Sequence, residues 1–277
     1  MITLKRIKKV LTNTPTYWLA IGFLTFLIML SLAAPFIPID PNKTDVSNMS
    51  AMPSLAHLFG TDEVGRDYFI RVVHGGRISL LVGILAMIAS TFIGTVIGLV
   101  SGYFGGIVDG VFMRIVDVLS SIPWMVLVIV LSVFMKPGLI TIIIVIGCFS
   151  WMSTARLVRA ETLSAKEREY VVYSNFIGIK PLTIITRHIL PNVLPTLIIA
   201  ATMNISGAIM TESALSFLGV GIQQPMASWG SLLQNAQSSL QRAPHMAVLP
   251  GLFIIFTVYS FNTLGNFLRD IASVEEA

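Results

Sequence analysis

The amino-acid sequence predicts an all-α membrane protein that crosses the bilayer about six times. Hydrophobic residues make up 55% of the 277 residues and charged residues only 12%, whereas about a quarter of the residues of a soluble domain are charged. The apolar residues gather into uncharged runs that approach or exceed the roughly 20 residues a spanning helix needs. The basic residues raise the pI to about 9.3, but most of them flank these runs. They therefore indicate lipid headgroups and membrane orientation rather than a nucleic-acid partner.

The first apolar run covers residues 17–37 and follows the basic cluster Lys5, Arg6, Lys8 and Lys9. A signal peptide cleaved at Ser31-Leu-Ala-Ala34 is the alternative, but the apolar region of a signal peptide has only roughly 7–15 residues. We therefore expect an uncleaved first transmembrane helix that follows a cytoplasmic N-terminus of residues 1–16. Residues 38–77 then form an extracytoplasmic loop, which is long enough for an amphipathic helix at the outer surface.

Five further apolar segments form a core transmembrane domain over residues 78–268. They cover about residues 78–101, 111–135, 139–155, 193–218 and 246–268. Tyr103-Phe-Gly-Gly106 is expected to form a turn after the first segment, and Lys136-Pro-Gly138 ends the second. Pro123 and Pro250 lie within spans and should kink them, because proline has no backbone N–H to donate.

Glycines recur every four residues at the end of the second span and beyond it. Gly94, Gly98 and Gly102 are expected to form one face where another helix backbone approaches closely. Gly106 and Gly110 fall around the predicted turn, where they more simply serve chain reversal.

Lysine and arginine determine the orientation of such a protein, because cytoplasmic segments carry an excess of both. With the N-terminus inside, twelve fall on the cytoplasmic side: Lys5, Arg6, Lys8, Lys9, Arg114, Arg156, Arg159, Lys166, Arg168, Lys180, Arg187 and Arg269. Six fall outside: Lys43, Arg66, Arg71, Arg77, Lys136 and Arg242. Both termini are therefore expected in the cytoplasm, with residues 269–277 as a short tail.

The main polar element between spans covers residues 160–191 and predicts a hairpin of two short amphipathic helices. Ser164-Ala-Lys-Glu167 matches a capping box, and Gly178 can end the first helix in a left-handed conformation. Pro181 suits the first turn of the second helix, which should end before Pro191. The expected apolar stripes are Tyr170, Tyr173 and Ile177 on the first helix and Leu182, Ile185 and Ile189 on the second.

The residue pattern alone leaves two interpretations of this hairpin open. It is either a connector that lies at the level of the lipid headgroups or a rigid docking element for a cytoplasmic partner.

The sequence gives no sign of catalysis or of a metal site. An ATP-binding loop ends in Gly-Lys-Ser/Thr, and the sequence contains no Gly-Lys pair. The four histidines lack metal-ligand spacing, and a lone Cys148 cannot form an internal disulfide. We therefore expect a chain that is not an enzyme and holds no cofactor, so that any ATP and Mg would be bound by another chain.

Three charged residues within spans are candidates for function, because a charge there costs about 2.5–3.5 kcal/mol on insertion scales. Glu212 lies deep in the fifth span. It either contacts a translocation pathway or has a structural partner, in the backbone or in a companion subunit. Arg114 and Asp117, three residues apart, are expected to pair with each other near the inner surface.

Several segments resemble one family of transport proteins. Glu169-Tyr-Val-Val-Tyr-Ser-Asn-Phe-Ile-Gly178 and Arg187-His-Ile-Leu-Pro-Asn192 resemble the EAA loop of ATP-binding-cassette (ABC) importer permeases, with Val172, Tyr173 and Ser174 where that motif has Glu-Ala-Ala. Five other segments resemble the second, C-type permease subunit of dipeptide, oligopeptide and nickel importers. They are residues 59–67, 114–123, 212–221, 229–230 and 266–270.

The resemblance implies a type I ABC importer permease fold in a bacterial inner membrane. It makes residues 160–191 the coupling hairpin that fits a groove on an ATPase, with the coupling residues Glu169, Tyr170, Tyr173, Gly178, Ile179, Leu190 and Pro191. The implied partners are a homologous permease subunit, two cytoplasmic ATPases and an extracytoplasmic solute-binding protein.

The substrate that we expect is a short peptide, and nickel or a metal chelate is the alternative within the same family. From another class, the alternative is an ATP-independent secondary transporter or channel, although such proteins often carry internal repeats and none is evident here.

Overall fold

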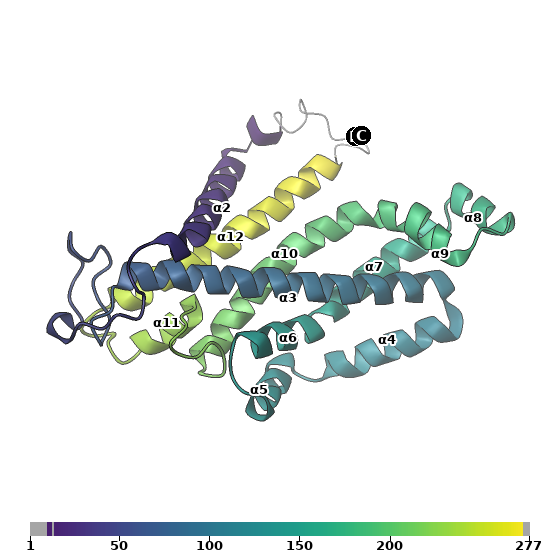
Figure 1. Ribbon diagram of the computed structural model, residues 1–277. Helices are drawn as coiled ribbons and strands as arrows, with labels where there is room; N and C mark the ends of the chain where they lie inside the picture. Colours follow the sequence, from purple (N-terminus) through teal and green to yellow (C-terminus); the bar gives the residue numbers. More distant parts are fainter. Residues whose placement is uncertain (1–9, 13, 274–277) are drawn as a thin grey trace.

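The computed structural model describes residues 10–12 and 14–273, which are mostly helical and contain no strand. Figure 1 shows a bundle built around one long helix, α3, with the α8–α9 hairpin near one of its ends and a long loop with α11 near the other. Lys5, Arg6, Lys8 and Lys9, and residues 274–277 of the predicted tail, lie outside the described residues. Five helical stretches are long and apolar enough to cross a membrane, and a bent pair makes a sixth. The expected all-α fold with about six spans is confirmed.

The elements follow one another along the chain with short connections, apart from the loop before α3 and the one before α11. They are α2 (Pro15–Ala33), η1 (Ala34–Phe36), η2 (Val46–Asn48), α3 (Tyr68–Phe104), α4 (Gly106–Ser121), α5 (Trp124–Phe134), α6 (Leu139–Phe149), α7 (Trp151–Lys166), α8 (Glu169–Phe176), α9 (Pro181–Ile184), η3 (Ile185–Ile189), α10 (Leu190–Phe217), α11 (Trp229–Ala236) and α12 (His245–Ser273).

The first span, α2, packs along α12, the last helix in the sequence. The hydroxyl of Tyr17 donates a hydrogen bond to the Asp270 carboxylate, and its ring lies 5.3 Å from that of Phe267 between centroids. α12 itself continues through Pro250 without interruption. The two helices that bracket the sequence therefore form one pair, which carries both ends of the described chain (Figure 1).

Helix α3 begins ten residues before the predicted second span. The side chain of Asp67 caps it by accepting a hydrogen bond from the Ile70 N–H at 3.0 Å, so the charged residues up to Arg77 are helical. Capping of this kind satisfies a backbone donor that would otherwise lack a partner. The loop that remains, residues 38–67, contains only the single turn η2, so the amphipathic helix considered for it is absent from these residues.

The glycine pattern on α3 is confirmed as a packing face against α7. A Cβ added to Gly94, Gly98 or Gly102 would lie 2.7 Å from side-chain carbons of Thr154, Val158 and Thr162 respectively. Only glycine allows this approach. A Cβ on Gly106 or Gly110 would meet nothing within 4 Å, and Gly105 and Gly106 have positive φ angles of 65° and 53° at the turn. The three packing positions and the turn position Gly106 are as predicted, but Gly110 lies inside α4 and does not serve the chain reversal.

The predicted kink at Pro123 is instead a complete break of the third span. Helices α4 and α5 meet at an angle of 81°. Ile122, the residue before the proline, is extended with φ −83° and ψ 127°, because the proline ring disfavours a helical conformation there. This break turns the short helix α5 away from the axis of α4 (Figure 1).

Candidate functional site: the α8–α9 hairpin and the cavity beside Pro123

The hairpin is shorter at its start than predicted, because α7 continues to Lys166. Ser164 lies inside α7 and Glu167 is its C-cap, while α8 begins at Glu169 after the extended residue Arg168, which makes no side-chain cap bond. The predicted capping box is therefore wrong. The helix that descends from the membrane keeps its regular hydrogen bonds through Ser164, and residues 160–166 belong to it.

Helix α8 turns its small face toward the bundle and its aromatic face outward. Val171 and Ser174 are buried, and Val171 joins an apolar cluster with Ile184, Ile185 and Ile189. Tyr173 is 65% exposed and Phe176 is 88% exposed. Of the predicted stripe, Tyr173 and Ile177 are exposed, whereas Tyr170 also contacts the start of α10. Phe176, which the periodicity did not single out, is the most exposed residue beside them.

Gly178 ends α8 in the predicted left-handed conformation, with φ +81°. Its N–H donates to the Asn175 carbonyl, and the N–H of Ile179 donates to the Ser174 carbonyl, each at 3.1 Å. This pair of bonds is the Schellman arrangement that satisfies the last carbonyls of a helix. A Cβ at position 178 would meet no atom within 4 Å, so the backbone conformation alone makes glycine necessary.

The second helix begins at Pro181 as predicted, but it does not end before Pro191, and it keeps only the Ile185 and Ile189 part of the predicted stripe. Residues Ile185–Ile189 form a π-helix that passes directly into α10, where Pro191 occupies the first turn. The wider π turn shifts the register of the residues before it. As a result Ile184 is buried with Ile185 and Ile189, whereas Leu182 is 72% exposed.

Tyr170 fastens α8 to the start of α10. The side-chain amide of Asn192 donates a hydrogen bond to the Tyr170 hydroxyl and another, at 2.6 Å, to the His188 carbonyl. The rings of Tyr170 and His188 also lie 6.0 Å apart. Of the predicted coupling residues, Glu169, Tyr170, Tyr173, Gly178 and Ile179 therefore lie in the hairpin, and Leu190 and Pro191 lie where it joins α10.

Two polar contacts hold the base of the hairpin against the turn between α3 and α4. Asp109 accepts hydrogen bonds from Ser101 and from the guanidinium of Arg159, and the Lys166 ammonium donates to the Tyr103 carbonyl at 2.6 Å. Asp109 has no recognisable signal in the sequence, since its partner lies fifty residues further along the chain.

The predicted pair between Arg114 and Asp117 does not form. Asp117 instead accepts a 2.9 Å hydrogen bond from Arg156 of α7, and Arg114 is exposed. The spacing of three residues on α4 allows the predicted pair, but α7 lies close enough to supply another cation. The observed pair therefore connects α4 with α7, whereas the predicted pair would have lain within α4 alone.

A cavity of about 520 Å³ opens beside the Pro123 break and the junction of α6 and α7. Helices α3 and α10 contribute the rest of its wall. Its polar lining consists mostly of hydroxyl and amide groups, with one cation: Ser90, Ser120, Ser150, Ser153, Arg156, Asn204 and Thr211. No local pattern in the sequence predicts this cavity, because its lining comes from four separate segments.

Glu212 does not line this cavity and is completely buried inside the subunit. Its carboxylate accepts hydrogen bonds from the hydroxyls of Ser79, at 2.9 Å, and Ser216, at 2.7 Å. Those two hydroxyls in turn accept from the N–H groups of Trp229 and Ile222. The carboxylate therefore connects α3, α10 and the segment that leads into α11.

Comparison with known proteins places these features in a family. The family model described as binding-protein-dependent transport system inner membrane component matches residues 94–273. The oligopeptide transport system permease protein OppC of Haemophilus influenzae is 42% identical over 250 residues, which cover 89% of this chain and 80% of the relative. The dipeptide transport system permease protein DppC of Bacillus subtilis is 41% identical over 89% of this chain and 78% of its own length.

A solved structure shows the same fold. The inward-facing MetNI methionine ABC transporter matches with a TM-score of 0.58 at 18% identity, over 73% of this chain and 97% of the matched chain. The expected type I permease fold and a multi-pass location in the inner membrane are supported. A secondary transporter or channel is not favoured. The chain therefore belongs to the family of binding-protein-dependent transport system inner membrane components, as a C-type permease subunit of an ABC importer.

Proposed function

We propose that this chain forms half of a transmembrane pathway for short peptides and is driven by ATPases that dock on its hairpin. The observation that carries the proposal is the outward-facing aromatic stripe of α8, held on a rigid support. Exposed apolar side chains that are grouped in this way mark a site of interaction with a protein or a membrane, and the match to importer permeases favours a protein. The relatives named as oligopeptide and dipeptide permeases support the peptide substrate.

The cavity beside Pro123 is the surface that we assign to this pathway. Its lining presents serine, threonine and asparagine groups, which can both donate and accept hydrogen bonds. Such a lining suits the amide groups of a peptide in any sequence. A nickel route would instead call for a concentration of His, Cys or carboxylate ligands.

The hairpin is connected to the cavity by helices that take part in both. Helix α7 reaches from the hairpin to Ser153 and Arg156 in the cavity wall, and α10 reaches from Asn192 to Asn204 and Thr211. A movement imposed on α8 therefore shifts two walls of the cavity together. ATP and Mg would be bound and used entirely in the ATPases, and this chain would perform the mechanical step.

In this assembly a homologous permease supplies the other half of the pathway, two ATPases bind inside, and a solute-binding protein delivers peptide outside. The excess of twelve cytoplasmic over six external Lys and Arg residues supports termini in the cytoplasm.

The proposal is tested by changing exposed hairpin residues whose loss should not disturb the fold. Tyr173→Glu and Phe176→Glu place a charge in the apolar interface, and we expect the ATPases to be lost on purification in mild detergent. Leu55→Glu makes the same kind of change at a fully exposed residue of the outer loop and should leave the complex intact. Retention of the ATPases by both hairpin variants, or ATP-independent uptake by the purified chain alone, would contradict docking at α8.

The conformation of Gly178 provides a second test, of coupling rather than of docking. Gly178→Val forces a β-branched residue into φ +81°, a conformation that such residues rarely adopt. We expect uptake of a labelled peptide to fall relative to ATP hydrolysis, while membrane insertion is unchanged. An unaltered ratio of uptake to hydrolysis would count against the hairpin as the coupling element.

A further inference from the structure

A second, smaller pocket lies at the outer end of α3 and has a cationic wall. It has a volume of about 280 Å³ and is bounded by the start of α3, by Pro41 and Asn42, and by Pro225–Ala227. Arg71, His74 and Arg77 all line it, and no acidic residue does among those described. The lining therefore presents two arginines and one imidazole but no carboxylate, and Asp62, outside the lining, lies 3.7 Å from the Nε of Arg71 as an ion pair.

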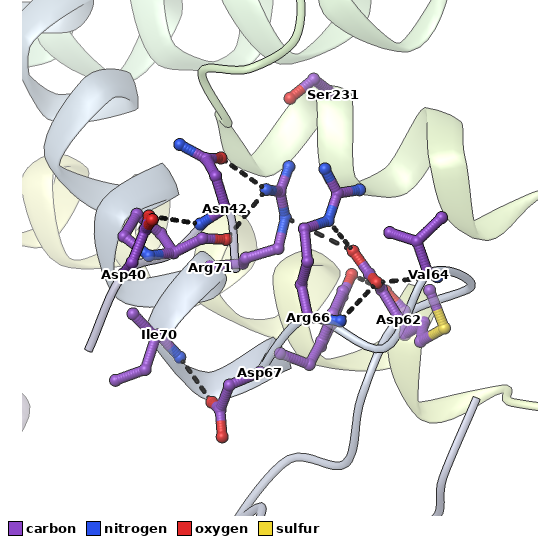
Figure 2. A network of polar contacts seen from close by, with 12 residues as sticks. Asp40, Asn42, Asp62, Val64, Arg66, Asp67, Ile70, Arg71 and Ser231 are labelled. Carbon is purple, nitrogen blue, oxygen red and sulfur yellow. Dashed lines mark hydrogen bonds and ion pairs between the residues drawn. The ribbon is translucent and has the colours of Figure 1, made fainter. Parts of the chain in front are cut away.

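The cationic wall contains nitrogen atoms that have no hydrogen-bond partner within the described chain. Arg71 is only 1% exposed. Its Nη1 donates to the Pro41 carbonyl and to Asn42, each at 3.2 Å, as Figure 2 shows. Its Nε and Nη2 make no hydrogen bond, and neither does the buried Nε2 of His74. Buried donors without a partner are rare in native proteins.

The nearest carboxylate does not satisfy these donors. Asp62 lies 3.7 Å from the Nε of Arg71, which is too far for a hydrogen bond. Asp62 is already used by the Nε of Arg66, at 2.6 Å, and by backbone N–H groups (Figure 2). The described chain therefore supplies no hydrogen-bond acceptor for the Nε and Nη2 of Arg71 or for the Nε2 of His74.

An exposed apolar stripe starts at this pocket and follows α3 into the membrane. Ile78, Leu81, Leu85, Ile88 and Phe92 follow His74 at helical spacing on one face. The exposed fraction rises along the stripe, from 39% at Leu81 to 53% at Ile88 and 70% at Phe92. From Ile78 to Ile88 the helix rises about 15 Å, which is about half the thickness of the hydrocarbon core.

We propose that the pocket and stripe together bind one phospholipid of the outer leaflet. The phosphate accepts hydrogen bonds from Arg71 and His74 and is paired with Arg77, and an acyl chain lies along the stripe. The occupant is an amphiphile because the cationic wall passes directly into an apolar face whose length matches one leaflet. Arg77 is exposed, so a headgroup can enter the pocket from the surrounding lipid.

The test uses the complete importer, purified in mild detergent, stripped of lipid and returned to vesicles of defined composition. Phosphatidylglycerol that stays bound is then measured by native mass spectrometry for the wild type and for Arg77→Gln. We expect the variant to bind about fivefold less lipid, the factor typical of one basic residue near an anionic headgroup. Arg242→Gln removes another exposed arginine from the outer side and should bind lipid as the wild type does.

A second variant and two competitors keep the outcome clear. Leu85→Ser with Ile88→Ser changes only the exposed stripe and should also lower the amount of bound lipid. A phosphate-free glycolipid should bind less than phosphatidylglycerol, and millimolar inorganic phosphate should not displace the lipid. Equal binding by Arg77→Gln and Arg242→Gln, equal binding of the glycolipid, displacement by free phosphate, or an acidic side chain of a partner subunit cross-linked into the pocket would each overturn the proposal.

Discussion

Asp109, near the start of α4, accepts hydrogen bonds from both the Nε and the Nη2 of Arg159 in α7. The same carboxylate accepts from Ser101 at the end of α3. One half-buried side chain thus joins three helices at the end of the bundle that carries the hairpin. The position of the hairpin relative to the bundle depends on this junction, because α7 leads directly into α8.

Asp109→Asn should therefore weaken the inner end of the bundle more than Asp117→Asn. A hydrogen bond to a charged group contributes about 1.5–3 kcal/mol, whereas a surface pair such as Asp117 with Arg156 contributes less than about 1 kcal/mol. The Asp117 pair is the more exposed, with side chains 48% and 60% accessible. Thermal unfolding of both variants in detergent measures the difference, and equal midpoints would contradict it.

Gly98→Ala should destabilise the contact of α3 with α7. The new methyl group would lie 2.7 Å from the Ala155 carbonyl oxygen and from Val158, and overpacking of this kind costs about 1–3 kcal/mol. Gly110→Ala is the matched control, since it adds the same group where nothing lies within 4 Å. The control should be neutral or slightly stabilising, because alanine favours helix over glycine. The order of the two melting temperatures decides the prediction.

Glu212→Leu should lower stability more than Glu212→Gln. Glutamine keeps one carbonyl oxygen as an acceptor, whereas leucine leaves the hydroxyls of Ser79 and Ser216 without their acceptor, at about 1–3 kcal/mol for each buried group. Peptide uptake and subunit assembly should be measured separately. We expect Glu212→Gln to transport normally once assembled, and a loss of uptake in a fully assembled Glu212→Gln complex would instead place this carboxylate on the pathway.

Deletion of Thr186 should change the orientation of the hairpin relative to α10. The deletion removes the extra residue of the π turn in Ile185–Ile189 and would rotate the hairpin about 100° around α10. We expect the ATPases to be lost on purification. Thr186→Ala removes only the hydrogen bond to the Leu182 carbonyl and should retain them. Similar ATPase recovery from both variants would show that the register is unimportant.

Features that depend on neighbours in sequence were predictable. The end of α8 at Gly178 and the start of α9 at Pro181 follow from backbone preferences of single residues. The glycine face on α3 follows from a spacing of four in one helix. The number of spans follows from uncharged length, which the hydrocarbon core imposes on any helix that crosses it.

Features that depend on tertiary contacts were not predictable. Asp117 pairs with Arg156, thirty-nine residues away, although a nearer cation was available at Arg114. Ser164 lies inside α7, which begins at Trp151. A capping motif cannot act there, because the backbone N–H groups of a helix interior already have partners. The π turn before Leu190 adds one residue to a helical turn and so changes which residues are buried. The spacing of apolar residues in the sequence does not predict this added residue.

The exposed face of α8 should also affect the turnover of the subunit before it is assembled. Tyr173 and Phe176 are exposed in the described chain. Under the docking proposed above, a copy without its ATPases therefore leaves an apolar surface uncovered, which favours aggregation and proteolysis. Turnover of the subunit should therefore fall as the ATPases become available. Balanced synthesis of all subunits would then be a requirement for this chain to accumulate, and a pulse-chase comparison of cells with and without the ATPases would measure it.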